Sequence, residues 1–192
     1  MVFVMQIFIP GFTELFILNQ RVFDGEIWRY LTAVFLHGGI VHLFYNLFAL
    51  LLFGFVLERT IGSNRFLIVF LSSGIFANVI AVNFYDSSLG ASGAIYGILG
   101  MIAVLRPFMI VWAFGLLMPM FLAAILWAIG DILGAFGFGA QNVGNMAHLS
   151  GIGVGALIGI LFKDKKRIKK DRIRIPENFV KEWERRYMDI KD

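Results

Sequence analysis

Cysteine is absent from this chain of 192 residues, which excludes both a disulfide framework and a thiolate metal site. Charged residues are also scarce, at 16% of the sequence. Most of the positive charge is confined to one end, because twelve of the 17 lysines and arginines follow Phe162. The rest of the chain has no basic face, so the net charge of +4 does not indicate binding to nucleic acid.

Apolar side chains are abundant instead, at 59% of the sequence with 21 phenylalanines. A soluble domain is about 45–50% apolar, so the excess indicates contact with a lipid bilayer. The order of apolar blocks and polar loops predicts an all-α membrane protein with a bundle of six transmembrane helices. We expect this membrane domain in residues 1–162 and a basic cytoplasmic tail in residues 163–192.

The six expected helices coincide with the apolar blocks, with residues 108–118 as an apolar loop or interfacial stretch. The blocks are Val2–Ile9, Val41–Leu57, Phe66–Phe84, Ala91–Leu105, a stretch from near Pro119 to Ile129, and Met146–Phe162. The first block provides only about 13 Å of helix, against a hydrocarbon core of about 30 Å. We therefore expect that the natural chain starts upstream of Met1 or that this sequence has been shortened.

The basic residues between the helices predict the orientation in the membrane. Arg59, Arg65 and Arg106 lie in the turns after the second and fourth helices, on the same side as the basic tail. The turns after the third and fifth helices carry no lysine or arginine. By the positive-inside rule, we expect a multi-pass protein of the cell membrane with both termini in the cytoplasm.

Three polar residues within the expected helices share one depth. Asn46, Ser92 and His148 precede the first basic residue after their helices by 13, 14 and 15 positions. At 1.5 Å per residue, all three lie roughly 20 Å from the cytoplasmic boundary. Polar groups at membrane depth are costly, so these residues are candidates for function.

Ser92 lies in the sequence Gly90-Ala91-Ser92-Gly93, at the outer start of the expected fourth helix. Free N–H groups at a helix N-terminus can stabilise an oxyanion formed on a carbonyl that Ser92 attacks. The flanking Gly90 and Gly93 leave room for a substrate backbone. The alternative interpretation is that Ser92 only caps its helix.

His148 begins the sixth helix at the level of Ser92, and a serine needs a neighbouring base to become nucleophilic. A lone histidine is more often structural, and this alternative stays open. Gly151 and Gly155 follow at helical spacing. We assign them a packing role, because small residues four apart let two helices approach closely.

His42 and Asn46 lie four residues apart on one helical face, where they can donate hydrogen bonds to an oxyanion. A hydrogen bond between helices is the alternative role for this pair. Asp86 and Asp131 lie near helix ends and are interpreted as solvated. The sequence therefore predicts a Ser–His dyad and not a triad.

Taken together, these residues resemble the rhomboid family of intramembrane serine proteases. The resemblance rests on four motifs in order: Trp28-Arg29; His37, His42 and Asn46; Gly90-Ala91-Ser92-Gly93; and Ala147-His148 with Gly151 and Gly155. It extends from about Val2 to Phe162.

The resemblance implies that Ser92 is the nucleophile and His148 the general base, with no metal or cofactor. It implies that His42, Asn46 and the Ser92 backbone N–H form the oxyanion hole. It also implies that Tyr96 packs on His148. The supporting and structural residues that it implies are His37, Gly90, Gly93, Trp28, Arg29, Glu58, Gly151 and Gly155.

The implied substrates are single-span membrane proteins. One alternative is a protease-dead relative that binds membrane clients. Another is a metal enzyme or transporter that uses His37, His42 and His148, because three histidines can ligate zinc.

Overall fold

The computed structural model describes residues 1–138, 144–165, 182, 185 and 186, so most of the predicted tail at 163–192 lies outside the described residues. The described chain is mostly helical. Its helices are α1 (Val2–Phe8), α2 (Phe12–Phe16), η1 (Gln20–Asp24), α3 (Arg29–Thr32), η2 (Ala33–Phe35), α4 (Ile40–Ala49), η3 (Leu50–Gly54), α5 (Phe55–Ile61), α6 (Ser63–Ala81), α7 (Ser92–Leu105), α8 (Met120–Ala135) and α9 (Asn145–Lys165). Its short strands are β1 (Leu18–Asn19), β2 (Ser87–Ser88), β3 (Ile110–Ala113) and β4 (Leu116–Pro119).

Three helices in the described part of the chain are long and apolar enough to cross a membrane. They are Ile40–Ile61, which joins α4, η3 and α5, then α6, and the Asn145–Lys163 part of α9. The apolar helices α7 and α8 are shorter. These five helices match the second to sixth apolar blocks of the sequence, with ends that differ by a few residues. The first block forms only the seven residues of α1.

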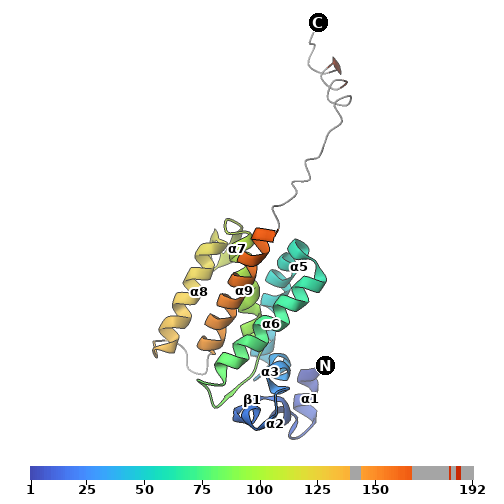
Figure 1. The fold of residues 1–192 in the computed structure, drawn as a ribbon, viewed down its shortest axis with the longest axis vertical. Coiled ribbons are helices and arrows are strands. Elements are labelled where there is room, and N and C mark those ends of the chain that lie inside the picture. The colour runs from blue at the N-terminus through green and yellow to red at the C-terminus, as the bar shows by residue number, and fades with distance from the viewer. Residues whose placement is uncertain (139–143, 166–181, 183–184, 187–192) are drawn as a thin grey trace.

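The helices of the bundle run side by side, while α1, α2, α3 and β1 gather at one end (Figure 1). This end lies opposite the one where the chain leaves α9, and we call it the Ser92 end because α7 starts there. Strand β1 pairs antiparallel with β2, with Leu18 opposite Ser88. The pairing joins the N-terminal segment to the loop that precedes Ser92.

Helices α7 and α9 pack backbone to backbone through glycines. A Cβ on Gly155 would collide with the carbonyl oxygen of Gly97, and a Cβ on Gly151 would collide with that of Gly93. No side chain larger than hydrogen fits at these crossing points. The expected packing role of Gly151 and Gly155 thus has a specific partner helix, and the contact brings the starts of α7 and α9 together.

The segment expected to be an apolar loop or interfacial stretch is a regular β-hairpin of β3 and β4. Its turn contains Phe114 and Gly115, both with positive φ (54° and 78°), as in the tight turns that match the twist of antiparallel strands. Val111 and Met118 face the core, whereas Trp112 is exposed.

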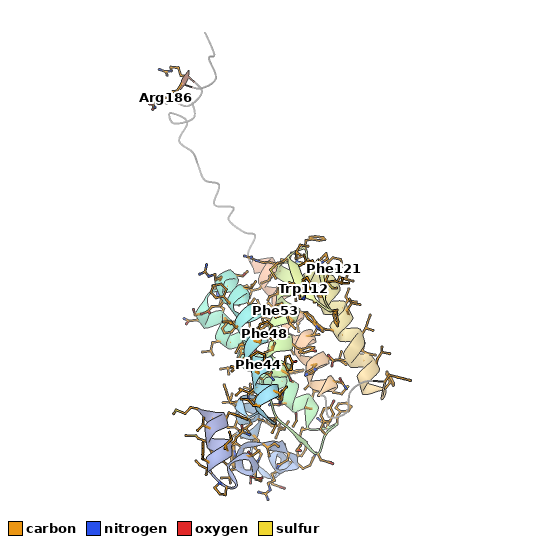
Figure 2. All side chains as sticks on the ribbon, turned by 180° about the vertical axis from the view of Figure 1, so that it is seen from behind. Phe44, Phe48, Phe53, Trp112, Phe121 and Arg186 are labelled. Carbon is orange, nitrogen blue, oxygen red and sulfur yellow. The ribbon has the colours of Figure 1, made fainter. Side chains whose placement is uncertain are left out.

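The outer surface of the bundle carries large apolar side chains. Phe44 and Phe48 are exposed and stack with their ring centroids 6.3 Å apart, and Phe53 lies farther along the same helix (Figure 2). Trp112 and Phe121 lie nearer the end of the bundle where the chain leaves α9 (Figure 2). An exposed apolar surface of this extent is typical of helices that face lipid.

Candidate active site

Ser92 is the first residue of α7, and its hydroxyl is directed at a second helix. The Ser92 Oγ lies 2.9 Å from Nε2 of His148 in the first turn of α9. The residue at the N-cap of α7 is Ala91, and no side chain caps this helix. The alternative interpretation of Ser92 as a helix cap therefore finds no support in its hydrogen bonding.

His148 is buried and contacts the side chain of Tyr96 as well as that of Ser92. Its ring stacks on Tyr96, one turn after Ser92, with ring centroids 4.1 Å apart and planes inclined by 11°. The packing of Tyr96 that the family resemblance implied is thus present. The stack holds the imidazole in the plane that presents Nε2 to Ser92.

Asp131 corrects the sequence interpretation, which treated this carboxylate as solvated. The residue is only 5% exposed, and its Oδ1 lies 2.9 Å from Nδ1 of His148. The carboxylate therefore belongs to the site. Asp86, which was interpreted in the same way, is exposed as expected.

The position of Asp131 along α8 could have identified it as a residue of the site. Asp131 follows Met120, the first residue of α8, by 11 positions, which is about 17 Å along the helix axis. This depth matches the level predicted for Ser92 and His148. The fifth helix was predicted to end before its first charged residue. This criterion necessarily placed Asp131 outside the membrane.

A cavity of about 850 Å³ opens beside these residues, and Ser92, His148, His42 and Asn46 all line it. His42 Nδ1 accepts a hydrogen bond from the Gly38 N–H at 3.4 Å. A neutral His42 ring then carries its proton on Nε2, which is free to act as a donor.

Asn46 uses part of its amide within its own helix. Its Nδ2 donates to the backbone carbonyl of His42 at 2.8 Å, which leaves one N–H for another acceptor. Asn46 is buried, and its Oδ1 has no hydrogen-bond partner among the described residues. His42 and Asn46 can therefore each supply one donor to an oxygen atom bound in the cavity.

Gly90 and Gly93 make room around the site in different ways. Gly90 has φ of +126°, and a Cβ there would lie 2.7 Å from the His42 ring. A Cβ on Gly93 would collide with Ala77 of α6. Gly90 thus permits the approach of His42, whereas Gly93 permits the packing of α7.

Arg29 is buried at 1% exposure and fastens the N-terminal segment over the Ser92 end. Its guanidinium donates to the carbonyl oxygens of Glu14 and Ile17, both at 2.8 Å, and its Nε donates to Glu26 at 2.6 Å. The neighbouring Trp28 is half exposed, and its indole N–H donates to the Leu15 carbonyl at 3.4 Å. Neither Trp28 nor Arg29 lines the cavity, although Ile17, which Arg29 holds by its carbonyl, does.

His37 and Glu58 lie apart from Ser92 and His148. The His37 ring is buried edge-on to His42, with centroids 5.3 Å apart, and neither of its nitrogens has a partner among the described residues. Glu58 is partly buried on α5, where its carbonyl accepts a bond from Gly62 at 2.7 Å.

Gln6 contributes a contact near the site that no pattern in the sequence indicates. The side-chain amide of Gln6 accepts from the His37 backbone N–H at 2.9 Å and donates to the His37 carbonyl at 3.2 Å. This paired contact attaches α1 to the loop that leads into α4. It depends on two segments that are 31 residues apart, so no local pattern marks it.

The proposed zinc alternative receives no support from the arrangement of the histidines. No group of three or more histidine, aspartate or glutamate side chains within the described ranges is placed to hold a metal ion. Both ring nitrogens of His148 are already hydrogen-bonded, to Ser92 and to Asp131.

Comparison with known proteins agrees with the motifs. The family described as Rhomboid domain matches residues 24–165. The chain is 36% identical over 138 residues to "Rhomboid protease GluP" of Bacillus subtilis, and 34% identical over 155 residues to YdcA of the same organism. It is 31% identical over 142 residues to "Rhomboid-like protease 1" of Toxoplasma gondii.

These alignments cover 70%, 77% and 72% of this chain, respectively. They cover 26% of GluP, 73% of YdcA and 48% of the Toxoplasma protein, so the chain spans much less than the full length of two of these relatives. The family match over residues 24–165 contains Ser92, Asp131 and His148. The resemblance inferred from the sequence is confirmed, and this membrane protein belongs to the rhomboid family.

Proposed function

We propose that this chain is an intramembrane serine endopeptidase that cuts the transmembrane segments of single-span membrane proteins. The observation that carries the proposal is the 2.9 Å contact between Ser92 Oγ and His148 Nε2 beside a cavity. A hydroxyl in contact with an oriented imidazole is the arrangement that activates a serine for attack. Family membership with relatives named as proteases supports the same reaction class.

In the proposed reaction, His148 Nε2 takes the proton of Ser92 as Oγ attacks the peptide carbonyl carbon. The carbonyl oxygen becomes an oxyanion, which accepts bonds from the Ser92 backbone N–H, His42 and Asn46. The protonated Nε2 then gives its proton to the leaving amine, and the C–N bond breaks. Water, deprotonated by the same nitrogen, hydrolyses the acyl-enzyme and restores Ser92.

We further propose a membrane domain of six spans in residues 1–162, with α1 in the first span, and a cytoplasmic tail in residues 163–192. The position of α1 at the Ser92 end supports this arrangement (Figure 1). By the positive-inside rule, the basic tail then lies in the cytoplasm and the Ser92 end faces the outside of the cell membrane.

This orientation has a consequence for the substrate. An intact transmembrane helix keeps its carbonyls in hydrogen bonds, so a segment must unwind before Ser92 can attack it. We expect small or helix-breaking residues near the cut, because glycine and proline weaken a helix. Water reaches the acyl-enzyme through the cavity beside His148.

The test is proteolysis by the purified protein in detergent and in liposomes, with a single-span protein as substrate. Wild type is expected to cut the substrate and to react covalently with a fluorophosphonate probe. Ser92→Ala and His148→Ala are expected to lose both activities. Binding without cleavage by wild type would favour the alternative of a protease-dead relative that holds membrane clients. Cleavage that survives Ser92→Ala would refute the proposed mechanism.

A further inference from the structure

We propose that Asp131 is a positioning residue, so that the site is a Ser92–His148–Asp131 triad. This inference rests on the proposed function of Ser92 and His148, and it replaces the dyad that the sequence predicted. Asp131 acts through His148 and touches no substrate.

The geometry uses both edges of one imidazole. His148 Nε2 lies 2.9 Å from Ser92 Oγ, and His148 Nδ1 lies 2.9 Å from Asp131 Oδ1. The three side chains come from three separate helices, α7, α8 and α9. Their order along the hydrogen-bonded chain is hydroxyl, imidazole and carboxylate, as in serine hydrolases of unrelated folds.

The carboxylate determines which nitrogen of His148 carries the proton. An ionised carboxylate only accepts hydrogen bonds, so Nδ1 must be the protonated nitrogen of the neutral ring. The lone pair of Nε2 is then directed at the Ser92 hydroxyl, as a general base requires. Without Asp131, none of the contacts described for His148 selects this tautomer, because a hydroxyl both donates and accepts.

Asp131 also stabilises the charge that forms during the reaction. When Nε2 takes the Ser92 proton, the His148 ring becomes a cation while Nδ1 remains bonded to Oδ1. The carboxylate keeps its charge and no second proton moves. Both residues are buried, at 8% and 5% exposure, so water screens their interaction little.

Packing alone does not account for an acid at this position. The other buried residues of α8 are Met120, Ala123 and Ala124, all near its start, and Asp131 is the one buried residue described in its second half. A buried carboxylate in an apolar setting carries a desolvation cost that an apolar side chain would avoid. The second oxygen, Oδ2, has no hydrogen-bond partner among the described residues, so the one hydrogen bond of the carboxylate goes to His148.

The kinetic test compares wild type with Asp131→Asn, which keeps the size of the side chain and removes its charge. We expect kcat to fall by about 10²- to 10⁴-fold, since orientation and charge at the base are lost. KM should be nearly unchanged, because Asp131 makes no contact with substrate. Asp86→Asn is the matched control, since Asp86 is exposed in the loop before β2, and it should retain wild-type kcat.

A second measurement determines the tautomer of His148 and does not require an active enzyme. Heteronuclear NMR of the histidine side chains, with His148 assigned by its loss in His148→Ala, should show the Nδ1–H form in wild type and in Ser92→Ala. Asp131→Ala should lose this form. A purely structural tie between α8 and α9 would lower stability in Asp131→Asn with no specific effect on kcat.

The outcomes separate this inference from the proposed function. An absence of Ser92-dependent cleavage in wild type would count against the protease, while the tautomer of His148 would still decide the role of Asp131. Wild-type kcat in a folded Asp131→Asn would overturn the triad alone. If the Asp131 variants do not fold, an Nε2–H ring in wild type would overturn it, and an Nδ1–H ring would support it.

Discussion

The Tyr96 ring lies parallel to the His148 imidazole, with centroids 4.1 Å apart, on the helix that begins with Ser92. An aromatic stack of this kind contributes about 0.5–1.5 kcal/mol. We expect Tyr96→Leu to lower kcat by up to about tenfold, because the base loses orientation while the chemistry stays intact. Tyr96→Phe keeps the ring, so its kcat should stay closer to that of wild type. Equal losses in the two variants would contradict the stacking argument.

The close approach of Gly155 to the Gly97 carbonyl predicts that a larger residue at position 155 disturbs the site, although it lies away from Ser92. Gly155→Ala would force α7 and α9 apart and destabilise the fold by about 1–3 kcal/mol, as overpacking typically does. The same variant should react more slowly with a fluorophosphonate, since Ser92 and His148 are carried by these helices. Thermal unfolding in detergent measures the first effect.

Gly153 offers the matched control on the same helix. It is exposed, and a Cβ there would meet no atom within 4 Å. Gly153→Ala should therefore leave both stability and labelling close to wild type. Equal destabilisation by the two substitutions would show that helix flexibility, and not the contact of α7 with α9, is the relevant property.

We expect the buried side chain of Arg29 to stabilise the N-terminal segment. Arg29→Ala would leave the Glu14 and Ile17 carbonyls without their donor and would destabilise this segment by about 1–3 kcal/mol. Limited proteolysis should then cut within the first 30 residues faster than in wild type. Arg21→Ala is the control, since Arg21 is exposed and its side chain makes no hydrogen bond or ion pair with a described residue. Unchanged proteolysis of Arg29→Ala would contradict this role.

The burial of His37 predicts that the stability of the fold depends on pH. This residue precedes α4, and burial, with a smaller contribution from the nearby His42, lowers the pKa of His37 below its usual value. The unfolded chain then binds a proton at a higher pH than the folded chain does. Folding stability from this group is present above about pH 6.5 and is lost as the pH falls below it.

The substitution His37→Phe removes this titration. Thermal unfolding of wild type and His37→Phe at about pH 7.5 and about pH 5 measures the difference. We expect a smaller loss of stability on acidification in the variant than in wild type. Parallel losses in the two proteins would show that His37 does not contribute to acid sensitivity.

The sequence predicted the five longer helices and the meeting of Ser92 with His148, because lipid requires long apolar runs and makes polar exceptions conspicuous. The same reasoning failed at Asp131. If a helix is taken to end at its first charged residue, it cannot contain a buried acid. The length of α8 nevertheless places Asp131 at the level of Ser92.

The β3–β4 hairpin was missed for a different physical reason. Alternation of apolar and polar residues marks a strand with one wet face. Here Val111 faces the protein core, while Trp112 on the opposite face is exposed on an apolar surface, so both faces are apolar and no alternation appears. Gln6 and the His37 backbone meet through tertiary structure alone, and no pattern within either segment predicts their contact.

The glycine contact between α7 and α9 also bears on the order of assembly during synthesis. The ribosome releases α7, then α8, and finally α9, so Ser92 and Asp131 are both made before His148. On the proposed mechanism, the nucleophile has no base until the last helix is inserted and docked on α7. The newborn chain is therefore inert toward neighbouring proteins until its bundle is complete.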